Sequence, residues 1–419
     1  MSRRKRNIII IVAFLLLIAL TLCAAQIRLR AQIIEIEREV SEIRGLERLR
    51  ETTLTFRSRD QIVAESAEET TSPDEDMERL HAFYRALELI PPDLDLAQTF
   101  REYFSGNIAG YFEFEAEAIT ILRKPGTQYA TLAIFERLLY AHEFMHVIQD
   151  QHYDLTQIWE RVGESDNYDL ALATEALIEG DADAVEWALA DRLLTRMSDR
   201  QLSYQIRQAE QMMTVSGRSE PAPAVIEAVF NFPYEQGRAF VESLVEHGGW
   251  EHVHLAFTSD PPQSSEQIYH PQRYLAGEAP IVVSLPDLVA IIGEGKHQVF
   301  DGVVGEFYLR QHLMTILSPS RATAAASGWG GDRLQIYKDS AADDLMWVWH
   351  LVWDGAEDAF EFAWAYRRFL DLRYDRANSD GRCWRRETTH CFARISASET
   401  RISMAADQAT ALALLDWHD

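Results

Sequence analysis

Residues 140–155 of this 419-residue chain read YAHEFMHVIQDQHYDL and hold three of its 13 histidines. His142 and His146 are four residues apart, so on a helix their imidazoles leave the same side one turn apart and could bind one ion. Glu143 lies beside them without competing as a ligand. These residue types at this spacing predict a metal site that does chemistry.

Zinc is the ion that this pattern predicts, one ion per chain. Zinc held by two neutral imidazoles and one further protein ligand keeps an open position for water and lowers the pKa of that water toward neutrality. Glu143 would then act as general base and accept a proton while the water attacks a carbonyl carbon. The alternative interpretation is two core histidines on an amphipathic helix that binds no metal.

A second segment, YDLALATEALIEGDADAVEWALADRLL, supplies the missing ligand. Glu175, Glu179 and Asp183 are four residues apart and form one carboxylate stripe on a helix otherwise rich in Ala, Leu, Ile and Val. Such carboxylates are costly to bury unless they are paired or bind a cation, and the alternative is that the stripe faces solvent. We expect Glu179 to bind zinc, Asp183 to orient a ligating histidine, and Gly180 to let the two helices approach closely.

His152 is the rival third ligand, and Glu175 is a weaker candidate. His152 follows His146 by six residues, the spacing of HExxHxxGxxH zinc proteases, in which the glycine breaks the helix so that the last histidine can turn back. Gln149 occupies the place of that glycine. If the helix continues, His152 lies about 240° around from His146, away from the metal. The spacing therefore favours Glu179.

Local patterns predict the elements that position these side chains. Ile134, Phe135, Leu138 and Leu139 continue toward His142 at spacings of three and four, which predicts a helix with the histidines on its buried face. Upstream, GYFEFEAEAITIL alternates apolar and acidic residues, which indicates a strand or tight hairpin with one wet face.

A Pro-bounded loop, PPQSSEQIYHPQRY, contributes a further candidate catalytic residue. Its Tyr269 and His270 are residue types that can donate a hydrogen bond to the oxyanion of a tetrahedral intermediate. We predict this role for His270 first, and a structural role in the loop is the alternative.

The N-terminus predicts the compartment. A basic cluster at residues 3–6 precedes residues 7–27, which carry no charge and are enough to cross the hydrocarbon core as a helix. The basic flank should stay in the cytoplasm, so we expect a single-pass membrane anchor with the rest of the chain outside. Cleavage before Gln26, giving a secreted protein, is the alternative.

Composition indicates a globular protein and argues against one class of partner. The chain has 40 basic and 66 acidic residues, and a net charge of −26 repels nucleic acid, so we expect no nucleic-acid partner. The predicted organisation is a cytoplasmic tail (1–6), an anchor (7–27), a helical stalk and linker (28–73), a catalytic domain (74–328) and a C-terminal antiparallel α+β domain (329–419).

The C-terminal region carries a cysteine pair. Cys383 and Cys391 are close in sequence and predict one disulfide, which suits an oxidising compartment. DRLQIYKDS, LMWVWHLVW, THCFARISA and TRISMAA read as strands. Between the second and third lies a helix for which Asp354 is the expected N-cap, with Glu357 three residues later.

The motifs also resemble a known family. His142, Glu143 and His146 followed by ALIEGDAD resemble the gluzincin branch of zinc metallopeptidases. Over roughly residues 77–370 the chain is more closely similar to a largely uncharacterised group of bacterial membrane-anchored or secreted HExxH proteins. The resemblance implies a zincin-like, mainly helical catalytic region and a peptide or protein substrate. It also implies that the strand at 111–122 is the sheet edge along which an extended peptide pairs.

These inferences converge on an α+β, membrane-anchored, extracytoplasmic zinc peptidase. The alternative is a zinc-stabilised envelope scaffold or binding protein that does not turn over substrate. Glu143 argues against that alternative, because a structural zinc needs no base and normally has a closed shell of four protein ligands.

Overall fold

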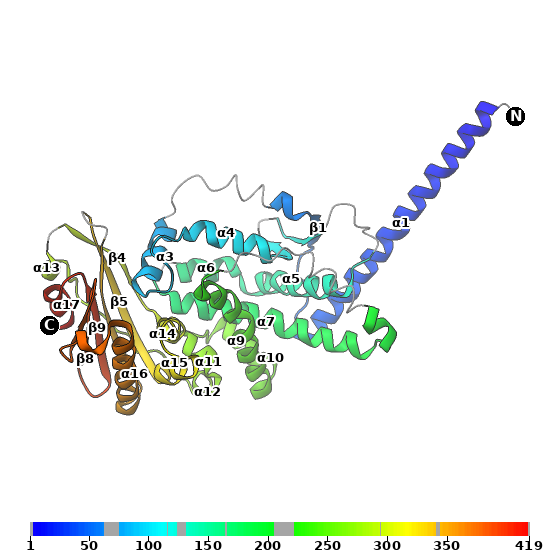
Figure 1. Cartoon of the computed structure of the whole chain (residues 1–419). Coiled ribbons are helices and arrows are strands. Elements are labelled where there is room, and N and C mark those ends of the chain that lie inside the picture. Colours follow the sequence, from blue (N-terminus) through cyan, green and yellow to red (C-terminus); the bar gives the residue numbers. More distant parts are fainter. Residues whose placement is uncertain are drawn as a thin grey trace. The chain divides into compact units, whose positions relative to one another are not determined.

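The computed structural model describes residues 3–62, 75–114, 116–123, 131–163, 166–204, 222–293, 295–340 and 344–417 (Figure 1). The chain is mainly helical and has a small mixed sheet and a six-stranded antiparallel sheet, which confirms the predicted α+β class. It forms two compact units: unit 1 comprises Met1–Thr70, Arg101–Leu155 and Asp181–Glu220, and unit 2 comprises Thr71–Phe100, Thr156–Gly180 and Pro221–Asp419.

Unit 1 is built around helices. Its elements are α1 (Arg3–Arg44), β1 (Thr53–Arg57), the end of α4 (Leu96–Asn107), β2 (Gly110–Glu113), β3 (Ala118–Leu122), α5 (Ile134–Tyr153) and the second part of α7 (Tyr168–Thr195).

Unit 2 combines helices with the large sheet. Its elements include α3 (Glu75–Ala86), α6 (Leu155–Gly163), the first part of α7, α9 (Ala224–Gly248), α10 (Trp250–Thr258), α11 (Ser265–Tyr269), α12 (Pro271–Leu275), α13 (Val289–Ile292), β4 (Lys296–Gly302), α14 (Gly305–Met314), α15 (Pro319–Ala326), β5 (Trp329–Asp339), β6 (Leu345–Trp353), α16 (Ala356–Tyr374), β7 (Cys383–Arg385), β8 (Thr389–Arg394), β9 (Glu399–Ala405) and α17 (Gln408–Leu415).

Helix α1, blue in Figure 1, joins the apolar N-terminal segment to unit 1 without a break. It is apolar and long enough to cross a membrane, with a mean hydropathy of 2.8 in its most apolar window. Farther along the same helix, Ile36, Val40 and Ile43 are buried and α1 packs on α5. The segment predicted to be a stalk is therefore partly core, because its apolar stripe has a partner helix.

The small sheet also uses residues from the predicted linker. Its strand order is β1-β3-β2, with β1 parallel and β2 antiparallel to β3. The segment at 111–122 is thus a hairpin, as one interpretation of its alternation predicted. β3 is the central strand of this sheet. Within 111–122, only β2 is therefore an edge strand along which a peptide could pair, as the family resemblance implies.

Helix α5 is the central element of unit 1. Every residue from Tyr140 to Gln149 is buried, so the helix has no solvent face along this stretch. At its start, the Glu136 carboxylate accepts a hydrogen bond from the Ala133 N–H (2.8 Å) and forms a buried ion pair with Arg123. At its end, Asp154 takes a left-handed conformation (φ 56°) that stops the helix.

The large sheet of unit 2 has the strand order β4-β5-β6-β9-β8-β7, antiparallel throughout. On one face Trp349 contacts His312 of α14 and Trp353 contacts Phe362 of α16. On the other face α17 packs over Val348 and the cysteines. The sheet begins at β4, before the boundary predicted at 329, because this edge strand is too polar to show an apolar pattern.

One predicted cap is wrong. The residue that caps α16 is Gly355, with no side-chain hydrogen bond, and the Asp354 carboxylate forms an ion pair with Arg273 instead. The nearby guanidinium provides a stronger partner for this carboxylate than the backbone N–H groups of the helix do.

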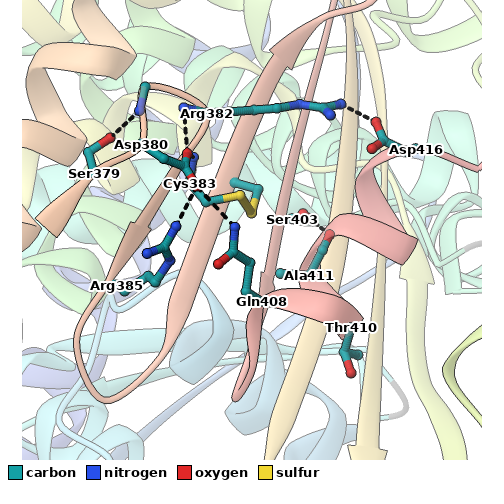
Figure 2. Close-up of a disulfide and its surroundings, with 12 residues drawn as sticks. Ser379, Asp380, Arg382, Cys383, Arg385, Ser403, Gln408, Thr410, Ala411 and Asp416 are labelled. Atoms are coloured by element: carbon teal, nitrogen blue, oxygen red, sulfur yellow. Dashed lines mark hydrogen bonds and ion pairs between the residues drawn. A yellow bond between two sulfur atoms is a disulfide. The ribbon is translucent and has the colours of Figure 1, made fainter.

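Cys383 and Cys391 lie directly opposite each other on β7 and β8, and their sulfur atoms are bonded at 2.01 Å (Figure 2). The Asp380 carboxylate closes the adjoining turn, since it accepts hydrogen bonds from the Cys383 N–H (2.8 Å) and the Gln408 side chain (3.0 Å). The hydrogen bond from Cys383 is the largest cause of the lowered pKa of Asp380. The disulfide and this turn together fix the end of the sheet against α17.

Replacing both cysteines by alanine should lower the free energy of unfolding of unit 2 by roughly 2–3 kcal/mol, because the unfolded chain regains the entropy of a short loop. Urea unfolding followed by tryptophan fluorescence would measure this, since Trp347 and Trp349 are buried in the same sheet. Cys23→Ser is the control, because Cys23 is exposed and unbridged. A double variant as stable as the parent would contradict the prediction.

Unit 2 also buries an acidic side chain at the start of α7. The Oδ1 atom of Asp169 accepts a hydrogen bond from the Ser265 N–H (3.0 Å), while Oδ2 is buried without a hydrogen bond among the described residues. Burial, followed by the charges of Asp332 and Glu306, raises the pKa of Asp169 to about 8. The folded protein therefore holds a proton on Asp169 that the unfolded chain releases near pH 4.

Asp169→Asn should stabilise the protein progressively relative to the parent as pH rises from about 4 to about 8. The unfolded parent binds fewer protons than the folded parent in this window, so the parent loses up to about 1.4 kcal/mol per pH unit while the variant does not. Urea unfolding at several pH values would measure the difference. Asp407→Asn is the opposite control, because the pKa of Asp407 is lowered by its cap hydrogen bond to Thr410. A pH-independent difference for Asp169→Asn would contradict the argument.

Candidate metal centre

The structure brings together the three residues that the sequence predicts as ligands. His142 and His146 of α5 and Glu179 of α7 each offer a ligand atom, and these atoms all lie within 4.8 Å of one another. The two imidazoles meet edge to face with their centroids 4.9 Å apart. His142 is 6% exposed and His146 9% exposed, and Glu179 is partly buried.

Helix α7 fixes Glu179 in this group. The boundary between the two units falls between Gly180 and Asp181, inside a single continuous helix. Glu179 and Asp183 lie one turn apart on this helix.

Glu186 holds the first histidine. Its Oε2 atom lies 3.2 Å from Nδ1 of His142, so this carboxylate can accept the Nδ1 proton and leave Nε2 as the ligating atom. Asp183, which was predicted to orient a histidine, is close as well: His142, Asp183 and Glu186 form a second group of donors within 4.8 Å. Two carboxylates one turn apart thus lie near His142, and the orienting role of Asp183 stays a prediction.

Gln149 holds the second histidine. Its Oε1 atom lies 2.9 Å from Nδ1 of His146, and its amide NH₂ donates to Oδ2 of Asp181 (3.1 Å). Both Gln149 and Asp181 are fully buried. Each histidine therefore contacts an oxygen acceptor through Nδ1, and the two acceptors come from different helices.

The remaining acidic residues of the predicted site lie on the same helices. Glu143 is 6% exposed and stands beside His142 on α5. Glu175 lies one turn before Glu179, and burial, with the charge of Glu179 as the second cause, raises the pKa of Glu175 to about 7. The stripe predicted from the four-residue spacing is partly buried, and the charges of Glu175 and Glu179 repel each other.

His152 is engaged elsewhere. α5 continues to Tyr153 with no break at Gln149, and Nε2 of His152 lies 2.8 Å from the backbone carbonyl of Glu47. His152 is in none of the donor groups found among the described residues. The uninterrupted helix carries it away from the histidine pair, as the angular argument requires.

Gly180 serves a different contact from the one predicted. A Cβ atom on Gly180 would come within 2.3 Å of the carbonyl group of Gly237 on α9, and a Cβ atom on Gly237 would come within 2.1 Å of the Ala176 carbonyl oxygen. The glycine thus permits close approach of α7 to α9 and not to α5. The sequence shows that a close contact is allowed but not which helix makes it.

His270 lies in unit 2, between the short helices α11 and α12 and not in an extended loop. Its Nε2 atom is 3.2 Å from the buried Glu306 carboxylate, which also pairs with Arg310. The Arg310 guanidinium stacks on the ring of Tyr269 at 3.7 Å. The role predicted for His270, donation to an oxyanion, stays a prediction.

The donor chemistry of the α5–α7 group fits zinc. Two imidazoles and one carboxylate are the three protein ligands of one class of catalytic zinc site, which leaves a fourth position open. The alternative group, one imidazole with two carboxylates, has a harder oxygen-rich donor set. His142, His146 and Glu179 would hold the ion, with Glu186 and Gln149 hydrogen-bonded behind the histidines.

Sequence reasoning missed Glu186 and Asp181 as supporting residues. Glu186 could have been found, because it continues the series of Glu179 and Asp183 at helical spacing. Asp181 lies outside that stripe, and no local pattern marks it. Gln149 was noticed only as the residue in the place of a glycine.

Comparisons with known proteins found one family and one solved structure. A family described as a domain of unknown function, DUF8575, matches residues 294–414, which hold the six-stranded sheet and not the α5 histidines. No curated protein matches the chain. A crystal structure of a proposed hydrolase with a novel fold from Chloroflexus aurantiacus is similar over 59% of this chain and 88% of its own, with 15% identity and a TM-score of 0.37.

Glu186→Leu should raise the dissociation constant for zinc by about 10–100-fold, because His142 loses the acceptor that orients it. Competition with a chromophoric chelator would measure this constant. Asp191→Leu is the matched control, since Asp191 is exposed on the same helix. Equal affinities for the parent and Glu186→Leu would show that Glu186 does not orient the ligand.

Proposed function

We propose that this chain is a membrane-anchored, extracytoplasmic zinc peptidase. His142, His146 and Glu179 hold one zinc ion, and Glu143 is the general base. The observation that carries the proposal is the convergence of two imidazoles and one carboxylate, whose ligand atoms lie within 4.8 Å of one another, with the histidines largely buried. The apolar helix α1 supports the anchor, and a cleaved signal sequence with secretion is the alternative.

The ion and Glu143 have separate roles in the proposed reaction. When bound, the ion would polarise a substrate carbonyl and make water nucleophilic near neutral pH. Glu143 accepts the proton of the attacking water and can return it to the leaving amine, as a general acid–base residue does. Glu143 is buried on α5 directly after His142 and is in none of the donor groups found among the described residues, which suits a base that is not a ligand.

The small sheet offers a way to align a peptide. β2 pairs with β3 on one side only among the described strands, and it packs on α5, the helix that carries the histidines. Gly110 of β2 lies against Leu139, one turn before His142. An extended substrate would add its main chain to β2 by strand pairing, and α5 would hold the ligands beside it.

The test uses the full-length protein in detergent. We expect the purified protein to contain one zinc per chain by mass spectrometry and to cleave a mixed peptide library. Glu143→Gln should keep its zinc and lose about 10²–10⁴-fold in cleavage rate, because only the base is removed. Glu179→Ala should lose zinc and activity together.

Other outcomes assign the protein differently. Zinc retained by Glu179→Ala but lost by Glu186→Ala would favour the His142–Asp183–Glu186 group. Zinc with no cleavage of any peptide by the parent would favour a metal-stabilised scaffold. A parent that binds no zinc would overturn the proposal, and His152→Ala is the matched histidine control because His152 contacts a backbone carbonyl.

A further inference from the structure

A line of buried hydrogen bonds runs from His146 to the end of α1. Nδ1 of His146 contacts Gln149, the Gln149 amide donates to Asp181, and Oδ1 of Asp181 accepts from Nε of Arg44 at 2.7 Å. The ion pair is sealed from water, with side-chain exposures of 1% for Arg44 and 0% for Asp181. Arg44 also donates to the Tyr153 hydroxyl at the end of α5 (3.2 Å).

The charges set the direction of every hydrogen bond in this line. Arg44 can only donate, and it keeps Asp181 as a carboxylate that can only accept. The Gln149 side chain must therefore turn its NH₂ toward Asp181 and its carbonyl oxygen toward His146. That oxygen requires a proton on Nδ1 of His146, which leaves Nε2 as the atom that can bind a metal.

The line begins on the apolar N-terminal helix. Arg44 is the last residue of α1, the helix whose earlier part is apolar enough to cross a membrane. α1 is also held to the turn that follows α7, through an ion pair of 2.6 Å between the buried Glu39 carboxylate and Arg196. The same helix thus supplies the apolar segment and the charge at which the hydrogen-bonded line starts.

We propose that Arg44, Asp181 and Gln149 are positioning residues that fix His146 with its proton on Nδ1, so that α1 is a working part of the metal centre. This inference rests on the proposed function and adds to it a set of residues that do not touch the metal. It also explains why a glutamine stands where related zinc motifs carry a glycine: the helix continues, and its side chain orients the second ligand.

A purely structural role of the Arg44–Asp181 ion pair can be distinguished from a positioning role by the choice of variants. Removing only Arg44 would leave Asp181 buried and unpaired, which destabilises a fold whatever the pair does. Replacing both charges by apolar residues of similar size is often neutral or stabilising. Such a double variant keeps the packing but removes the anchor that sets the direction of the Gln149 amide.

The experiment compares four full-length proteins in detergent: the parent, Arg44→Met with Asp181→Leu, Gln149→Met, and the control Arg38→Met. Arg38 lies on the same helix in an exposed ion pair with Glu42. Nitrogen NMR of labelled histidine reports the tautomer of His146 in the metal-free protein, at a pH where the imidazole is neutral. Chelator competition gives the zinc dissociation constant, and thermal unfolding reports stability.

We expect His146 to carry its proton on Nδ1 in the parent and in Arg38→Met. In the other two variants both tautomers should be populated, and the zinc dissociation constant should rise about 10–100-fold even where thermal stability is kept. An unchanged tautomer in the double variant would overturn the inference. If the parent binds no zinc, the proposed function fails, while the tautomers still decide whether these residues position His146.

Discussion

The burial of α5 is the constraint on which unit 1 depends. Ten successive residues of this helix are buried, and among them are polar groups that need partners once water is removed, His142, His146 and Gln149 included. α7 provides two carboxylate acceptors: Glu186 contacts His142, and Asp181 accepts a hydrogen bond from Gln149. α1 then supplies the cation that lets Asp181 be buried as a carboxylate. The packing of α1 and α7 around α5 thus provides partners for the polar groups that α5 buries.

The elements that could be predicted are those whose patterns are local. The spacing of apolar residues locates α5 and α7, and alternation locates β2 with β3 and four strands of the large sheet. The ligand candidates followed from the same periodicity, since the helical repeat turns His142 and His146, and separately Glu179 and Asp183, to one side. α5 carries two of the three donors one turn apart and α7 carries the third, so each helix could be recognised from its own sequence.

Three of the errors and omissions share one physical cause: they depend on which distant segment becomes the neighbour. Arg44 meets Asp181 across 137 residues, and nothing near either residue in the sequence indicates the other. Gly180 was correctly expected to permit a close approach, yet its neighbour is Gly237. Asp354 has the residue type and place of an N-cap, but Arg273 lies nearer to its carboxylate. Residue type limits what a side chain can do, and the tertiary structure selects among these possibilities.

The charge distribution on α7 gives a separate argument for a cation at the histidine pair. Glu175, Glu179 and Asp183 follow one another at one-turn intervals, with Glu186 one turn farther on. Burial and the charge of Glu179 together raise the pKa of Glu175 to about 7, so the protein holds like charges close together in a poorly solvated place. A divalent ion beside Glu179 would relieve this repulsion and lower the pKa of Glu175. On the other side of α7, the Arg44 guanidinium already neutralises the charge of Asp181. In the function proposed for this chain, a metal ion would neutralise the carboxylate charge on the side of Glu179.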